Sequence, residues 1–212
     1  EIVEILRGRM GLDIKAISPD GTKLIFTELE AEDSNKLFLY DLVNEKMHDL
    51  FIKNRSRYTN INWVGDSSGF YLTTNHNRDR VGLALYDLNK QNLRFIETPS
   101  VDIFQARLSK DKKYLAWVEN NEMHSVLRVK DLQDDRQLSI PDIPRGVICS
   151  LDWASEVPVL VLGITSSQIP GDIWSWNINT GKVHRSTRSE TAGLDMASMV
   201  SPSAIRFNAH DG

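Results

Sequence analysis

The sequence predicts an all-β protein made from one repeated unit. Two observations lead to this prediction: an internal repeat with a period in the forties, and short apolar segments separated by turn sequences within each unit. No segment has a sustained period of 3.6 residues, and the best helical candidate, residues 193–199, is short. We therefore expect little helix.

Two independent positions set the register of the repeat. The first is an acidic residue in a turn, with successive spacings of 46, 45 and 45 residues: Asp20, Asp66, Asp111 and Glu156. The second ends a later strand, with spacings of 46, 44 and 46 residues: Asp41, Asp87, Asp131 and Asn177. Two positions that keep the same period are hard to obtain by chance.

Each unit reads as four short strands. In the first, IKAIS is closed by the turn PDG, and KLIFT, KLFLYDL and KMHDL follow. We expect four units, at about 12–57, 58–102, 103–147 and 148–190, within a region 1–200. A period in the forties with four strands per unit is typical of a β-propeller. We expect these four units to be blades of a larger ring. The alternative is an irregular β-sandwich, whose strands lack such a period.

Composition narrows the class of partner. The chain has 212 residues, 41% of them hydrophobic and 25% charged, with a formal net charge of −4. No Lys/Arg cluster indicates nucleic-acid binding, and no apolar stretch is long enough to span a bilayer. No secretory leader is visible, and Cys149 is the single cysteine. We therefore expect a cytoplasmic location, with no nucleic acid or membrane as partner.

The stretch GDSSG at residues 65–69 matches G-x-S-x-G, the nucleophile motif of serine hydrolases. That motif needs a strand before the serine and a helix after it, whereas FYLTT, a strand, follows here. In the repeat register, Ser67 falls in the hairpin turn that corresponds to PDG of the first unit. We therefore predict that Ser67 is a turn residue, and we expect no catalytic residue in this chain.

Metal and cofactor chemistry finds no support in the sequence. The histidines lie in no zinc-binding motif: His48 and His184 fall on fourth strands, and His76 falls in a loop that we expect to be exposed. The turn aspartates are one unit apart, so we expect them to cap turns rather than share a metal. We expect no cofactor and no metal.

The candidate functional residues lie on the first strand of each unit, which lines the central channel of a propeller. Side chains there alternate, and one set, including Trp63, Leu108 and Trp153, is apolar and predicts core. The same prediction places Lys15 and Ile17 in the core. The other set is mostly polar, and its channel-facing candidates occupy equivalent positions: Asn62, Arg107 and Asp152. The alternative is that they only hydrogen-bond between units, with Arg107 paired to Asp152.

The unit SPDGTKLIF…LFLYDL resembles the propellers of prolyl oligopeptidase-family enzymes and of TolB-like proteins, over about residues 12 to 186. The C-terminal SAIRFNAHDG resembles the junction that opens the α/β-hydrolase domain in that family, especially its acylaminoacyl-peptidase branch. Ile205, Phe207, Asp211 and Gly212 match the junction, so 201–212 is expected to be a junction strand.

The resemblance implies a non-catalytic propeller that caps and gates the active site of a serine peptidase acting on short peptides. It implies an α/β-hydrolase domain of the same parent protein as partner, and more blades than four. The alternative is a standalone TolB-like propeller that binds a protein or a ligand.

An incomplete ring would leave apolar surface on its first and last units, and we therefore expect self-association through these end blades. The residues expected to lose a neighbour are Ile17, Leu24 and Phe26 in the first unit and Trp153, Leu160, Trp174 and Trp176 in the last.

Overall fold

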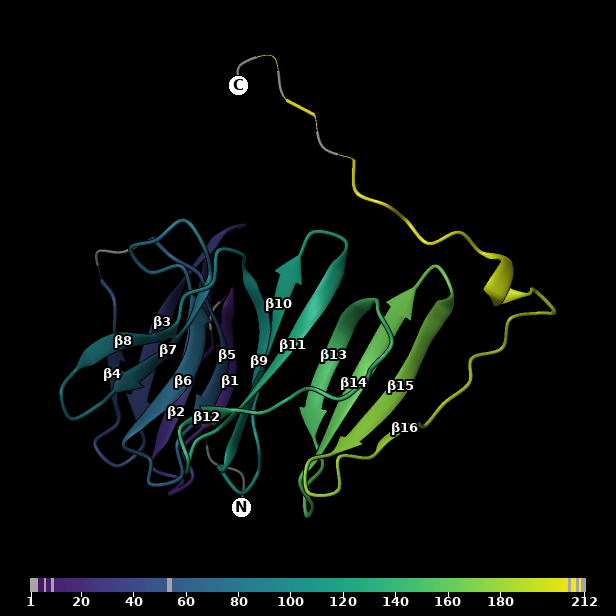
Figure 1. The fold of residues 1–212 in the computed structure, drawn as a ribbon. Helices are drawn as coiled ribbons and strands as arrows, with labels where there is room; N and C mark the ends of the chain where they lie inside the picture. Colours follow the sequence, from purple (N-terminus) through teal and green to yellow (C-terminus); the bar gives the residue numbers. More distant parts are fainter. Residues whose placement is uncertain are drawn as a thin grey trace.

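The structure is a computed structural model that describes residues 4–5, 7–8, 10–52, 55–205, 207–208 and 210. It is all-β, with four antiparallel four-stranded sheets (Figure 1), as the repeat predicts. Within the described residues the single helical element is a 3₁₀ turn, Met196–Ser198, inside the segment that is the best helical candidate. None of the described residues forms a helix that could cross a membrane.

Each sheet is a meander of four consecutive strands, and we call the sheets blades 1 to 4 in chain order. Blade 1 contains β1 (Leu12–Ile17), β2 (Lys23–Ala31), β3 (Ser34–Asp41) and β4 (Lys46–Asp49). Blade 2 contains β5 (Tyr58–Trp63), β6 (Gly69–Thr74), β7 (Gly82–Asp87) and β8 (Asn92–Glu97). Blade 3 contains β9 (Ile103–Leu108), β10 (Tyr114–Asn121), β11 (His124–Asp131) and β12 (Arg136–Gln137). Blade 4 contains β13 (Val147–Trp153), β14 (Val159–Ser166), β15 (Ile169–Asn177) and β16 (Val183–Arg185).

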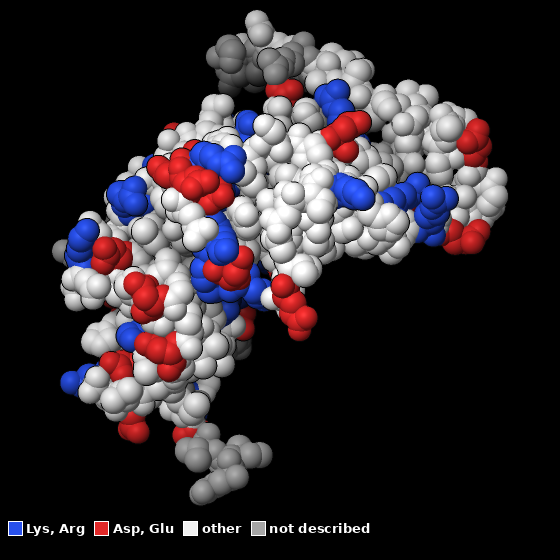
Figure 2. Space-filling model, turned by 60° about the horizontal axis from the view of Figure 1, so that its bottom comes forward, with Lys and Arg blue, Asp and Glu red and all other residues white. Residues whose placement is uncertain are grey.

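The first strands of the blades are neighbours in space. β1 contacts β5, β5 contacts β9 and β9 contacts β13, so the blades follow one another around the inner strands as in a β-propeller. Figure 2 shows a curved molecule whose visible face mixes Lys and Arg with Asp and Glu.

The turns confirm why the acidic residues recur. Asp66 accepts hydrogen bonds from the backbone N–H and the hydroxyl of Ser68, and Asp20 does the same for Thr22. At the second recurring position, Asp41 accepts the backbone N–H groups of Val43 and Asn44. These are Asx-type turns, in which the side chain replaces a backbone acceptor.

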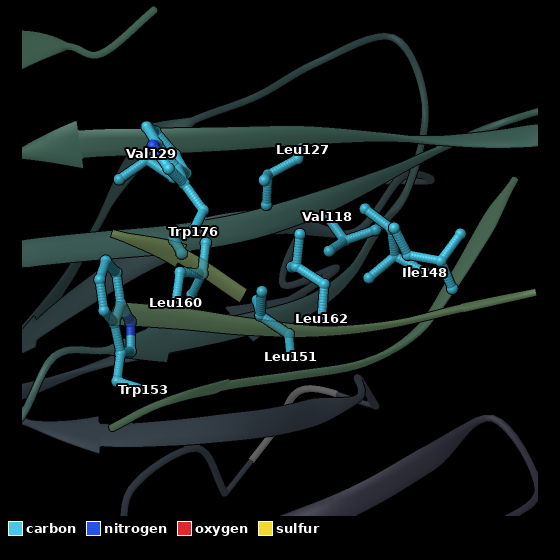
Figure 3. Close-up of a cluster of buried hydrophobic side chains, with 11 residues drawn as sticks. Val118, Leu127, Val129, Ile148, Leu151, Trp153, Leu160, Leu162 and Trp176 are labelled. Atoms are coloured by element: carbon cyan, nitrogen blue, oxygen red, sulfur yellow. The ribbon is translucent and has the colours of Figure 1, made fainter. Parts of the chain in front are cut away.

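Apolar side chains fill the space between adjacent blades. The largest cluster joins blades 3 and 4 (Figure 3): Val118, Leu127 and Val129 of blade 3 face Leu151, Leu160 and Leu162 of blade 4. A second cluster joins blades 1 and 2 around Ile25, Leu37 and Phe70, and a third joins blades 2 and 3 around Leu83 and Trp117. Each blade therefore has a forward face toward the next blade and a rear face toward the previous one.

The residues predicted to be uncovered on the end blades are mostly buried, so that part of the prediction is wrong. In blade 4, Trp153, Leu160 and Trp176 lie on the rear face and pack against blade 3. Trp174 is half-buried beside them. In blade 1, Leu24 and Phe26 are buried in a cluster with Phe38 and Tyr40.

The predicted burial of Lys15 and Ile17 in the core is wrong. Ile17 is 59% exposed and Lys15 is exposed, whereas Ala16 packs against the cluster between blades 1 and 2. A β-bulge between Ile14 and Ala16 shifts the register at Lys15, and the first strands of the other blades have register shifts too, so the bulge does not set blade 1 apart. Ile17 lies on the rear face, which has no described blade behind it, so the expectation that Ile17 loses a neighbour is confirmed. In blades 2 to 4, Trp63, Leu108 and Trp153 are buried as predicted.

Candidate functional site

The three candidate residues occupy equivalent places on the inner strands. Asn62 pairs with Tyr71, Arg107 with Ala116, and Asp152 with Val161, each on the neighbouring strand of its own blade. All three lie one residue before a buried residue of the rear face, so they are on the forward faces. Their different contacts separate their roles.

Asn62 links blades 2 and 3. Its Nδ2 donates to the carbonyl oxygen of Asn60 at 2.6 Å and to that of Ala106 in β9 at 3.2 Å. Its Oδ1 accepts the backbone N–H of Leu108 at 3.0 Å. Because both ends of this amide are bonded to backbone, the alternative of hydrogen bonding between units describes Asn62 well.

Arg107 reaches back toward blade 2. Its Nη1 donates to Oδ1 of Asn60 at 2.9 Å and to the carbonyl oxygen of Ala106 at 2.9 Å. Arg107 is partly buried, and no carboxylate of the described residues lies within ion-pair distance of its guanidinium. The alternative in which Arg107 pairs with Asp152 is therefore wrong.

Asp152 is exposed and makes one local contact. Its Oδ1 accepts the backbone N–H of Trp153 at 2.8 Å. The neighbouring indole, that of Trp153, donates instead to the carbonyl oxygen of Arg107 at 3.0 Å and so ties blade 4 to blade 3. No ion pair joins this carboxylate to Arg107, although both residues line one cavity.

Asn60 was not selected as a candidate, yet it organises this region. Its φ is 53°, and it is the one non-glycine residue of the described strands with a positive φ; the others lie in turns and loops. Its Nδ2 donates to Oγ1 of Thr73 at 2.8 Å and to the carbonyl oxygen of Phe104 at 3.2 Å. Asparagine tolerates this conformation better than most residues, but a strained residue within a strand often marks a functional position.

Two cavities open beside Arg107. One has a volume of about 370 Å³ and is lined by Lys15, Thr59, Asn60, Ile61, Asn62 and Arg107. The other has a volume of about 580 Å³ and extends to blade 4, where Asp152 lines it together with Arg57 and Gln105 of the preceding blades. Arg107 stands between the two, so the first cavity has cationic walls and the second has both signs of charge.

Ser67 has the conformation of a turn residue, as predicted. Its φ is 59°, matching the equivalent Gly21 at 70° and Lys112 at 65°. Ser67 is buried, and its Oγ accepts the backbone N–H of Asp20 at 3.2 Å, which ties the turn of blade 2 to that of blade 1. The residue after this turn, Gly69, begins strand β6 and no helix follows.

His48 and His184 lie where the sequence predicts, whereas His76 is less exposed than predicted. His48 and His184 are exposed on the outer strands β4 and β16. His76 lies in its loop but is half-buried, with its Nδ1 at 2.8 Å from the hydroxyl of Tyr58, and burial lowers its pKa. Burial also raises the pKa of Tyr58 to about 12. Within the part of the chain that the structure describes, no three His, Cys, Asp or Glu side chains are grouped to hold a metal.

The chain leaves blade 4 through a fixed anchor. Asp172, which is fully buried, pairs with Arg185 and accepts hydrogen bonds from the backbone N–H and hydroxyl of Ser189. The Arg185 contact and those to Ser189 lower the pKa of Asp172 to about 2, against the opposing effect of burial. Farther along, Gln168 of the β14–β15 turn donates to the carbonyl oxygen of Met199 at 2.9 Å.

The proposed junction lies beyond this anchor. Ile205 and Phe207 are 84% and 87% exposed and lie outside any strand. Asp211 and Gly212 lie outside the described residues. The junction at 201–212 therefore stays a prediction.

Solved structures share this fold at low sequence identity. A mutant of puromycin hydrolase matches with a TM-score of 0.74 and 14% identity over 94% of this chain and 32% of that chain. Prolyl oligopeptidase B from Galerina marginata matches with a TM-score of 0.69 and 19% identity over 88% of this chain and 28% of that chain. TolB from Acinetobacter baumannii matches with a TM-score of 0.65 and 16% identity over 90% of this chain and 46% of that chain.

These likenesses establish the architecture. The chain is a β-propeller module of the kind found in prolyl oligopeptidases, in puromycin hydrolase and in TolB, and it spans less than half the length of each of those three proteins. No protein-family profile matches the sequence, and no curated protein matches it.

Proposed function

We propose that this chain is the propeller that caps and gates the active site of a serine peptidase acting on short peptides. The observation that carries the proposal is the fold it shares with prolyl oligopeptidase B and puromycin hydrolase, in which the matched part is 28% and 32% of a longer chain. The partner is then an α/β-hydrolase domain of the same protein, which supplies the nucleophile. A cytoplasmic location belongs to the same proposal, supported by the single cysteine.

The path of the chain after blade 4 supports a partner over one end of the propeller. The tail is held beside the β14–β15 turn, where a cavity of about 890 Å³ lies between it and the loops of blades 3 and 4. In Figure 1 the yellow C-terminal segment continues outward from that end of the blades. A domain joined there would cover the ends of the inner strands and make them its entrance.

The polar inner face supports gating of peptides. The side chains of Gln105 and Arg107 on β9 line these cavities with polar groups, and a passing peptide backbone needs such partners. A standalone binding propeller is the second candidate, supported by the match to TolB over 90% of this chain.

Expression of the complete reading frame that contains residues 1–212 tests the proposal. We expect a fluorophosphonate probe to label a serine outside this segment, and we expect cleavage of short reporter peptides but not of folded proteins. A complete product that takes up no probe would overturn the proposal in favour of the binding module.

Gating itself needs a variant at the inner strands. Gln105→Trp places a bulky ring on β9, where Gln105 now donates to the carbonyl oxygen of Cys149 at 3.0 Å. We expect it to lower kcat/KM for peptides, with a larger effect on longer ones. His184→Trp, on the exposed outer strand β16, is the matched control and should leave kcat/KM unchanged. Equal rates for both variants would contradict gating through the inner face.

A further inference from the structure

The cavity of about 370 Å³ lined by the first strands β1, β5 and β9 has the chemistry of an anion site. Its walls are Lys15 and Arg107 together with the neutral Thr59, Asn60, Ile61 and Asn62, and no acidic side chain lines it. Its volume, about 370 Å³, is in the range of small-ligand pockets. Lys15 is already paired with Asp13 on its own strand. The uncompensated positive charge of the cavity is therefore Arg107.

The hydrogen bonds of Arg107 leave one edge of its guanidinium available. Nη1 is committed to Asn60 and to the carbonyl oxygen of Ala106. Among the contacts of the described residues, Nε and Nη2 have no acceptor. These two nitrogens form one edge of the planar group, and two parallel N–H groups on one edge match the two oxygens of a carboxylate.

Asn60 holds that edge in place before any ligand arrives. Its left-handed backbone and its bonds to Thr73 and to the carbonyl oxygen of Phe104 fix its amide, and Oδ1 of that amide fixes Nη1 of Arg107. A guanidinium with a fixed orientation loses less conformational entropy when it binds. The strain at Asn60 thus has a role in orienting Arg107.

We propose that Arg107 binds a peptide carboxylate in this cavity, with Asn60 as the positioning residue. The proposal rests on the proposed function, because it identifies the end of the peptide that the propeller would recognise. The carboxylate has two sources, the C-terminus of the peptide or an acidic side chain. Asp152 lines the second cavity beside Arg107 and repels a carboxylate there. A carboxylate is therefore expected to bind Arg107 in the first cavity, which has no acidic side chain.

Binding to the 212-residue chain tests the proposal without any catalytic activity. The probes are tetrapeptides with fluorescein at the N-terminus: one with a free C-terminus and no acidic side chain, the same peptide amidated, and an amidated peptide containing glutamate. Fluorescence anisotropy gives each Kd. We expect the free carboxylate to bind at least about tenfold more tightly than the neutral amidated peptide, as loss of a charged hydrogen-bonded pair implies. Equal Kd values for the free-acid peptide and the amidated glutamate peptide would assign the site to carboxylates of either source.

Variants separate the site from general electrostatics. Arg107→Gln should abolish the preference for the carboxylate, and Arg107→Lys should retain only part of it because an ammonium cannot bond side-on with two oxygens. Arg94→Gln removes one charge from the exposed outer strand β8 and is the matched control, with no expected change in Kd. Thermal melts of all variants check that the fold is kept.

The results also separate this inference from the proposed function. Wild-type chain that binds all three peptides equally, or an unchanged preference in Arg107→Gln, overturns the carboxylate site even if the complete protein proves to be a peptidase. An Arg107-dependent preference in a protein without peptidase activity overturns the proposed function and keeps the site.

Discussion

Substitution of Ser67 tests the conclusion that GDSSG is a hairpin turn. Ser67 is 5% exposed, its φ is 59°, and its Oγ accepts the backbone N–H of Asp20 at 3.2 Å. The equivalent turn positions Gly21 and Lys112 have the same left-handed backbone. The conformation therefore belongs to the turn, and the side chain adds one hydrogen bond between blades 1 and 2.

The two replacements Ser67→Ala and Ser67→Gly divide these contributions. Both remove the hydrogen bond, worth about 0.5–1.5 kcal/mol net. Only glycine also relieves the strain of the left-handed backbone, which is about 1–2 kcal/mol. The greater loss of conformational entropy when glycine folds offsets about 0.5–1 kcal/mol of this gain. We expect Ser67→Ala to lower the free energy of unfolding by about 1 kcal/mol. Ser67→Gly should be the more stable of the two variants. Each kcal/mol of difference in unfolding free energy between them corresponds to about 2–4 °C in Tm.

Urea and thermal unfolding, followed by far-ultraviolet circular dichroism and by tryptophan fluorescence, measure this order. Ser201→Ala, in the exposed tail, is the control and should match the wild type. A parallel reaction with a fluorophosphonate probe and peptide mapping should find no adduct at Ser67. If Ser67→Gly is less stable than Ser67→Ala, or if Ser67 is labelled, the turn assignment is refuted.

Three further predictions follow from the packing and the charges. Leu162→Ala, at a fully buried position between blades 3 and 4, should cost about 2–5 kcal/mol of unfolding free energy in urea titrations, against about 1 kcal/mol or less for Val161→Ala on the opposite, half-buried face. Asp172 has a folded pKa of about 2 against an ordinary value of 3.8, so the stability from its pair with Arg185 is present above about pH 4 and is lost as the pH falls toward 2. Asp172→Asn should therefore flatten the loss of stability over that pH range, and a loss as steep as the wild type's would contradict this. Self-association through the forward face of blade 4 should appear as concentration-dependent sedimentation that Val161→Lys abolishes; a wild type that sediments as a monomer at all concentrations would exclude it.

The architecture was predictable because each blade repeats the same local chemistry. The Asx turns at Asp20 and Asp66 and the strand-ending Asp41 make hydrogen bonds within three residues along the chain, so their meaning is visible in the sequence. Ser67 was assigned correctly for the same reason: a turn position is defined by its neighbours along the chain.

The candidate site was predictable only in part, because its contacts cross between blades. The register of the repeat placed Asn62 and Arg107 correctly on equivalent inner positions. It did not predict that Arg107 bonds to Asn60 rather than to Asp152. The positive φ of Asn60 arises at a β-bulge, where the register of β5 and β6 shifts after Thr59. An asparagine at the start of a strand is a weak indication of such a bulge, and nothing else in the sequence marks it.

The forward face of blade 4 is a second place where the sequence did not predict which side chains meet a neighbour. The sequence VLVLGIT of β14 is apolar at both alternating positions, so alternation could not tell Leu160 and Leu162, which face blade 3, from Val161, which faces outward. Asp152 shares that outward face. At the equivalent position in blade 2, Oδ1 of Asn62 accepts a backbone N–H of the next blade. A carboxylate can accept in the same way but cannot donate as the amide of Asn62 does. Asp152 is therefore suited to a backbone N–H or a cationic group of whatever packs against the forward face of blade 4.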